Sequence, residues 1–144
     1  MVDTIVNEVK NAVLAVITGA DDVLSALRGA VKNQVTGVVR DAANMAVSVV
    51  DAISGAVSGS VEAAADAGVD MGKAAVSVVQ GAIDAAADTG MSATDAASAA
   101  VMGVMKSAKK VGGEAVGTVK DALLSAAALP HDVVMSAIEG SEDK

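Results

Sequence analysis

Apolar residues recur every eleven positions along almost all of this 144-residue chain. Stepping by eleven from Val9, Val13 or Val16 meets an apolar or small side chain at nearly every step, and each such set of residues is called a lane here. Of the 10 basic and 18 acidic residues, only Arg28 and Lys144 fall in the five most apolar lanes. Eleven residues make three helical turns of about 3.67 residues each. The lanes therefore predict α-helix with one continuous apolar face, and they exclude the two-residue alternation of a strand.

The phase of the repeat predicts one long helix. The lanes do not shift at Gly19, Gly59 or Gly90, where loops of arbitrary length would have changed the phase. We therefore expect an all-α fold in which residues 1–129 form one long, nearly continuous amphipathic helix. Pro130, the only proline, interrupts it, and residues 130–144 are expected to form a short C-terminal helix and a polar tail.

Such a helix needs partners. The chain has 14 glycines and no aromatic residue, and each glycine inside a helix costs about 1 kcal/mol relative to alanine. Stability must then come from burying the apolar face. Small residues such as Gly37 and Gly59 line one flank of that face, whereas bulkier ones such as Leu124 and Met135 line the other. The small flank of one helix can receive the bulky flank of the next. Because this contact joins two different surfaces of identical units, it is a head-to-tail contact.

We therefore expect a homo-oligomer of more than two helices, forming a right-handed multi-helix coiled coil or an α-helical barrel. The expected oligomer interface consists of the larger residues of the apolar lanes. These are Val9, Val13, Val16, Leu24, Leu27, Val31, Val35, Val38, Val49, Ile53, Val57, Met71, Val79, Ile83, Val101, Val104, Val119 and Leu123.

An antiparallel helical bundle within one chain is the alternative fold. A fixed register permits it, because a hairpin can insert a multiple of eleven residues. Candidate breaks are Thr18-Gly19, Ser58-Gly59-Ser60, Thr89-Gly90 and Gly112-Gly113. Ser92 and Asp95 have the spacing of a capping box at a helix start.

The lanes, which cover about residues 2–139, resemble those of hendecad coiled coils, proteins built on eleven-residue repeats. The match is one of periodicity, so it implies an architecture and no activity. It implies a structural, self-assembling protein such as a scaffold, a filament or a hydrophobic tube.

The segment from Lys110 to Lys120 also resembles the eleven-residue repeats of synucleins and exchangeable apolipoproteins, which coat lipid. This resemblance implies the alternative function, an amphipathic coat on a lipid surface or storage granule, with lipid or another apolar cargo as partner. The polar face departs from that type because it is rich in Asp and lacks an aromatic anchor.

Charge and composition exclude several classes. A formal charge of −8 and the absence of aromatic residues argue against a nucleic-acid partner. No uncharged stretch is long enough for a transmembrane span. The acidic N-terminus lacks a signal-peptide pattern, so a cytoplasmic location is expected.

We expect no enzyme, no cofactor and no metal site, because one histidine and no cysteine leave no evident catalytic or ligand set. Paired carboxylates such as Asp84 and Asp88 are typical of a solvated acidic face, although such pairs could bind divalent cations in a ring of chains. Arg28 is interpreted either as a contact with a carboxylate or ion inside the assembly or as a side chain that reaches the edge of the apolar face.

Overall fold

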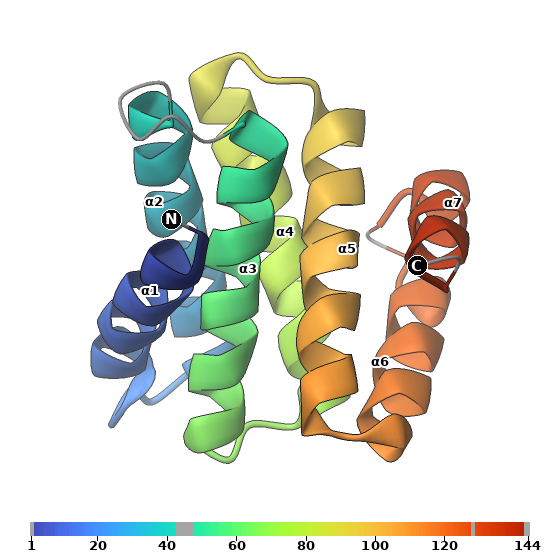
Figure 1. Ribbon diagram of the computed structural model, residues 1–144. Coiled ribbons are helices and arrows are strands. Elements are labelled where there is room, and N and C mark those ends of the chain that lie inside the picture. Colours follow the sequence, from blue (N-terminus) through green and yellow to red (C-terminus); the bar gives the residue numbers. More distant parts are fainter. Residues whose placement is uncertain (1, 43–47, 128, 143–144) are drawn as a thin grey trace.

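Short helices joined by tight turns make up the chain (Figure 1). The computed structural model describes residues 2–42, 48–127 and 129–142. Within these ranges there are seven α-helices and no strand, so the prediction of an all-α fold is confirmed. The helices are α1 (Val2–Ile17), α2 (Val23–Asp41), α3 (Val49–Asp66), α4 (Met71–Thr89), α5 (Ala93–Val111), α6 (Gly113–Ser125) and α7 (His131–Glu142).

The prediction of one long continuous helix is wrong. The chain folds into a multi-helix bundle in which α2, α3, α4 and α5 alternate in direction, as Figure 1 shows. In the centre of the chain the phase survives because α3 and α4, each with its following turn, take up 22 residues, or two repeats. Gly68, Gly90 and Gly112 follow one another at this spacing, and each takes a positive φ at or just beyond a helix end, of 78°, 75° and 150° respectively.

The candidate breaks at Gly19, Gly90 and Gly112 are confirmed, since each lies between two helices. The candidate break at Ser58-Gly59-Ser60 is wrong. These three residues are buried in the interior of α3, where their small side chains serve packing rather than a turn.

Side chains that accept a hydrogen bond from the backbone fix four helix starts. Asp22, Ser48, Asp70 and Ser92 each accept a hydrogen bond from the backbone N–H three residues later, which satisfies a donor that the helix itself cannot. The predicted cap at Ser92 is thus confirmed. At α2, the backbone N–H of Ser25, and then its hydroxyl, lower the pKa of the Asp22 carboxyl.

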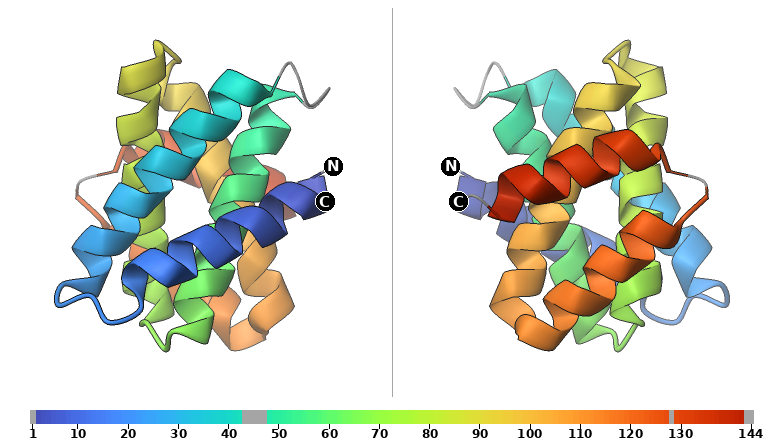
Figure 2. Two further views of the ribbon diagram at one scale, coloured as in Figure 1. Left: turned by 90° about the vertical axis from the view of Figure 1, so that its left-hand side faces the viewer. Right: turned by 90° about the vertical axis from the view of Figure 1, so that its right-hand side faces the viewer.

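Each helix packs most extensively on the helix two positions away. One layer contains α1, α3, α5 and α7, and the other contains α2, α4 and α6. Within the second of these layers, α2 and α4 run in the same direction, because Arg28 pairs with Asp84 and Lys32, one turn later, pairs with Asp88. Figure 2 shows α1 and α2 closing one side of the molecule and α6 and α7 the opposite side.

Glycines allow helices that are two positions apart in the chain to approach closely. Gly59, Gly81 and Gly103 lie 22 residues apart on the small flank. A Cβ at Gly81 would lie 2.6 Å from the carbonyl oxygen of Arg28, and one at Gly103 would lie 2.8 Å from that of Ser54. At Gly59 it would lie 2.9 Å from the backbone nitrogen of Lys10. The small flank therefore receives the backbone of the helix two positions earlier.

The core is built from small side chains. Alanine and valine dominate it, and its larger members include Ile53, Met105 and Leu123. The last helix, α7, begins directly after Pro130 and packs on α5. Because each side chain is small, stability depends on repeating the same close contact many times.

Candidate functional site

The predicted interface residues lie mainly inside the chain's own bundle. Twelve of them are buried there, namely Val9, Val13, Leu27, Val31, Val35, Ile53, Val57, Val79, Val101, Val104, Val119 and Leu123. Leu24, Val38, Met71 and Ile83 are partly buried. Val16 and Val49 are exposed, at 52% and 38%. An oligomer interface at these positions stays a prediction.

Three ion pairs join helices two positions apart. Lys10 Nζ lies 3.0 Å from Asp66, and Lys32 Nζ lies 3.3 Å from Asp88. Arg28 donates from Nε and Nη2 to the two carboxylate oxygens of Asp84, at 2.8 and 3.1 Å. Arg28 thus contacts a carboxylate of its own chain.

The four aspartates from Asp66 to Asp88 each have a structural partner. The carboxylates of Asp66, Asp84 and Asp88 hold cations of neighbouring helices, and Asp70 caps α4. Across the described side chains, no group of three or more His, Asp or Glu is placed to hold a metal ion. Nor does any helix of residues 2–42, 48–127 and 129–142 have the length and hydropathy of a transmembrane span.

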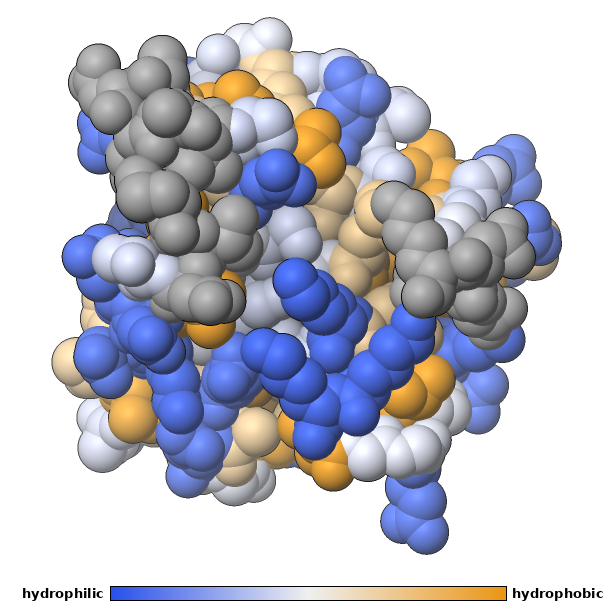
Figure 3. All heavy atoms as spheres, viewed as in Figure 1, coloured by the Kyte–Doolittle hydropathy of each residue, from blue (hydrophilic) through white to orange (hydrophobic). Residues whose placement is uncertain are grey.

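The face seen in Figure 1 carries no extended apolar area. Figure 3 shows hydrophilic side chains over its lower part and apolar side chains in separate patches.

At the α1 and α2 end, a groove of about 190 Å³ has an apolar floor and a polar rim. Ile5, Val9, Gly37 and Val38 form the floor, and Glu8, Gln34 and Asp41 form the rim. Gly37 belongs to the same lane as Gly59 and Gly81, but among the described residues no other helix or side chain comes within 4 Å of the position its Cβ would take.

At the opposite end, α6 and α7 enclose a second groove of about 220 Å³. Leu124, Met135 and Ile138 line it together with Lys120 and Glu139. Met135 is 41% exposed. Leu124 and Met135 belong to the bulky flank, so the two ends of the array present opposite flanks of the apolar face.

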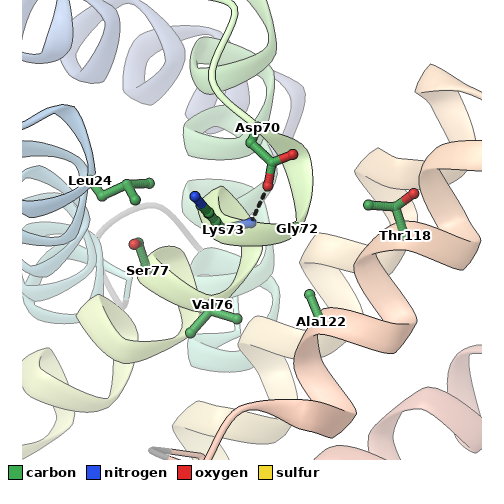
Figure 4. A pocket seen from close by; sticks show the side chains of 8 residues that line it. All are labelled: Leu24, Asp70, Gly72, Lys73, Val76, Ser77, Thr118 and Ala122. Carbon is green, nitrogen blue, oxygen red and sulfur yellow. Dashed lines mark hydrogen bonds between the residues drawn. The ribbon is translucent and has the colours of Figure 1, made fainter.

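A third and larger groove, of about 430 Å³, crosses α4 (Figure 4). In the described part of the chain α2 and α6 do not pack on each other, so α4 is the floor between them. Leu24 of α2, Val76 of α4 and Ala122 of α6 supply apolar surface. The polar lining comes from Asp70, Lys73, Ser77 and Thr118. Sequence reasoning did not find this groove, because it arises where two non-adjacent helices flank a third.

Comparisons with protein-family models, curated proteins and solved structures find no match to this chain. Its function must therefore be inferred from its own geometry and chemistry.

Proposed function

We propose that this protein is a non-catalytic structural protein that assembles with further copies of itself, head to tail, by continuing its own helix array. The observation that carries the proposal is the uncovered Gly37. At the equivalent positions Gly59, Gly81 and Gly103, a helix of the same chain covers the glycine. The chain thus contains three copies of the contact that a second molecule would make at its open end.

The two ends complement each other in shape. The α1 and α2 groove offers the small flank at Gly37, and the α6 and α7 groove offers the bulky side chains Leu124 and Met135. Seating one end on the other joins different surfaces of identical chains. Such heterologous contacts produce a ring if the rotation closes and a filament if it does not.

Composition supports a role without chemistry. The only histidine, His131, is exposed at the start of α7, and the chain has no cysteine. Burial of the apolar lanes inside the single chain favours an assembly of folded helix arrays over an assembly of long continuous helices.

Native mass spectrometry and sedimentation velocity over a range of concentrations test the proposal. We expect multimers whose fraction rises with concentration. Gly37→Leu should abolish them, because the new side chain fills the groove that receives the neighbour. Gly29→Leu is the matched control, since Gly29 also lies on α2 with nothing within 4 Å of its Cβ position. A monomer at every concentration, or equal loss with both variants, would contradict the proposal.

Salt gives an independent test of the contact. Glu8 and Asp41 rim one end, whereas Lys120 and Glu139 offset each other at the other end. The repulsion between copies therefore comes mainly from the formal charge of −8 on each chain. Because salt screens exposed charges, assembly should strengthen as salt is raised. Assembly that weakens with salt would mean that ion pairs, and not the apolar flanks, hold the copies together.

Coating of a lipid surface remains the alternative. The apolar lanes of the chain lie in its core, so the helix array would have to open before it could coat lipid. Neutral phosphatidylcholine vesicles would then bind the monomer and abolish its cooperative unfolding. Under the assembly proposal, vesicles leave both the multimers and the unfolding transition unchanged.

A further inference from the structure

The groove over α4 is lined by a serine whose hydroxyl makes no hydrogen bond to the described residues. The buried polar side chains among the described residues are Ser58, Ser60, Ser77 and Ser107. Ser58 donates to the carbonyl of Gly103, Ser60 to that of Ala56 and Ser107 to that of Ser58. Ser77, only 8% exposed, makes no such bond to any residue that the structure describes.

The hydroxyl of Ser77 opens onto the groove. Among the described residues, the fully buried side-chain oxygens without a partner are Thr36 Oγ1 and Glu62 Oε2, so the Ser77 oxygen is reached from the space that it lines. Water in the groove can satisfy this hydroxyl in the free protein. A bound molecule that accepts a hydrogen bond can take the place of that water.

A positive charge stands one helical turn from Ser77. Lys73 is exposed, and no carboxylate of the described residues lies within 4.0 Å of its amino group. Figure 4 shows the polar ends of Lys73 and Ser77 on the side of α4 near Leu24. The carboxylate of Asp70 is engaged as the helix cap, accepting the backbone N–H of Lys73 at 3.0 Å. Two donors, one of them charged, thus converge beside an apolar wall.

We infer that this groove binds a small amphiphile with an anionic head and a short alkyl chain, of which a medium-chain carboxylate is the simplest example. The carboxylate accepts from Ser77 Oγ and pairs with Lys73, and the alkyl chain covers Leu24, Val76 and Ala122. The volume of about 430 Å³ lies within the usual range for small-molecule sites, roughly 300–1,000 Å³. The site is separate from both end grooves, so it can bind its ligand whether or not the chains assemble.

Decanoate, kept below its micelle concentration and titrated by calorimetry, is the probe. Decanol and decyltrimethylammonium carry the same chain with an uncharged or cationic head. We expect decanoate to bind at least ten times more tightly than either. Comparable binding of all three, or preference for the cation, would overturn the inference.

Two variants locate the head group. Lys73→Met should weaken decanoate binding about tenfold, and Lys106→Met, which changes an exposed lysine of α5 away from the groove, should not. Ser77→Ala should weaken binding about fivefold without lowering the thermal midpoint, because the hydroxyl it removes makes no hydrogen bond to the described residues of the free protein.

Ser58→Ala is the matched control for Ser77→Ala. It removes a buried hydroxyl that is hydrogen-bonded and distant from the groove, so it should lower the thermal midpoint and leave decanoate binding unchanged. If Ser77→Ala destabilises the protein as Ser58→Ala does and leaves binding intact, Ser77 is an ordinary core residue and the inference fails. Sedimentation of the same samples shows separately whether the proposed assembly occurs.

Discussion

The centre of the helix array and its ends carry the same repeat, yet they differ in what covers it. At the centre, Gly81 of α4 lies under the backbone of α2, and its Cβ position is 2.6 Å from the carbonyl oxygen of Arg28. At the end, Gly37 occupies the same lane with nothing within 4 Å. The repeat therefore sets which face a residue lies on, and the place of its helix in the array decides whether that face is covered.

Placing a charge at the centre should have the largest effect. Val57 of α3 is fully buried, so Val57→Asp leaves an unpaired buried carboxylate that costs about 3–5 kcal/mol or more. That is a large share of a typical free energy of unfolding of about 5–15 kcal/mol. We therefore expect the variant to lose its cooperative unfolding transition in urea, as monitored by circular dichroism.

Val16→Asp is the control for this change, because Val16 is 52% exposed in α1. It should alter stability by no more than about 0.5 kcal/mol. A Val57→Asp protein that kept its folded monomer and only lost its multimers would instead place Val57 between chains.

The two glycines of the opening comparison give the next largest effect. Gly81→Ala forces a methyl group against a backbone carbonyl, and overpacking of this kind costs about 1–3 kcal/mol. Gly37→Ala meets no obstacle, so it should raise the free energy of unfolding by up to about 1 kcal/mol through better helix propensity. The opposite signs are the prediction, measured by urea unfolding. Equal effects would mean that the covered and open ends are not distinct.

Sequence reasoning predicted the helices and their apolar faces but not their number. The lanes at Val57, Val79 and Val104 are buried as the repeat implies. Lane phase cannot distinguish a continuous helix from helices with 22-residue spacing, because both keep an eleven-residue register. The turn signal was present in the recurrence of Gly68 and Gly90, each two residues before a capping side chain.

The candidate sites were less accessible to sequence reasoning. The small and bulky flanks could be predicted from the lanes, and these are the flanks that the two end grooves present. The partner of each flank could not be predicted, because the lanes do not say whether the neighbouring helix belongs to the same chain or to another one. Ser77 lies eleven residues from both Asp66 and Asp88, so the repeat assigns it to the polar face. Only the tertiary arrangement places it in a groove.

Helix starts extend the comparison between centre and ends at a smaller scale. Ser92 caps α5 in the centre, whereas α6 begins at Gly112 without a side-chain cap. Ser92→Ala should cost about 1 kcal/mol. Thr94→Ala, an exposed change in the first turn of the same helix, should cost no more than about 0.5 kcal/mol. Amide exchange should show α6 opening before α5 in the parent protein, and faster exchange in α5 than in α6 would contradict this.

The smallest effect concerns the pair that ties α1, an end helix, to the central α3. Lys10 of α1 donates a hydrogen bond to Asp66 of α3. This bond, and then the negative charge of the carboxylate, raise the pKa of Lys10 above its ordinary value. The folded state therefore holds this proton more tightly than the unfolded state does. The resulting stability is fully present below the ordinary lysine pKa and is lost as pH rises through the raised value.

Lys10→Met should therefore remove part of the fall in thermal midpoint between about pH 9 and 12, the range in which lysines titrate. At neutral pH it should change the midpoint little, because exposed ion pairs contribute little. Asp66→Asn should have the same consequence, and the double variant should add nothing further, since both changes break one contact. An alkaline fall of unchanged size in Lys10→Met would show that the ion pair adds no stability, and that the apolar packing of α1 and the close approach at Gly59 hold α1 on α3.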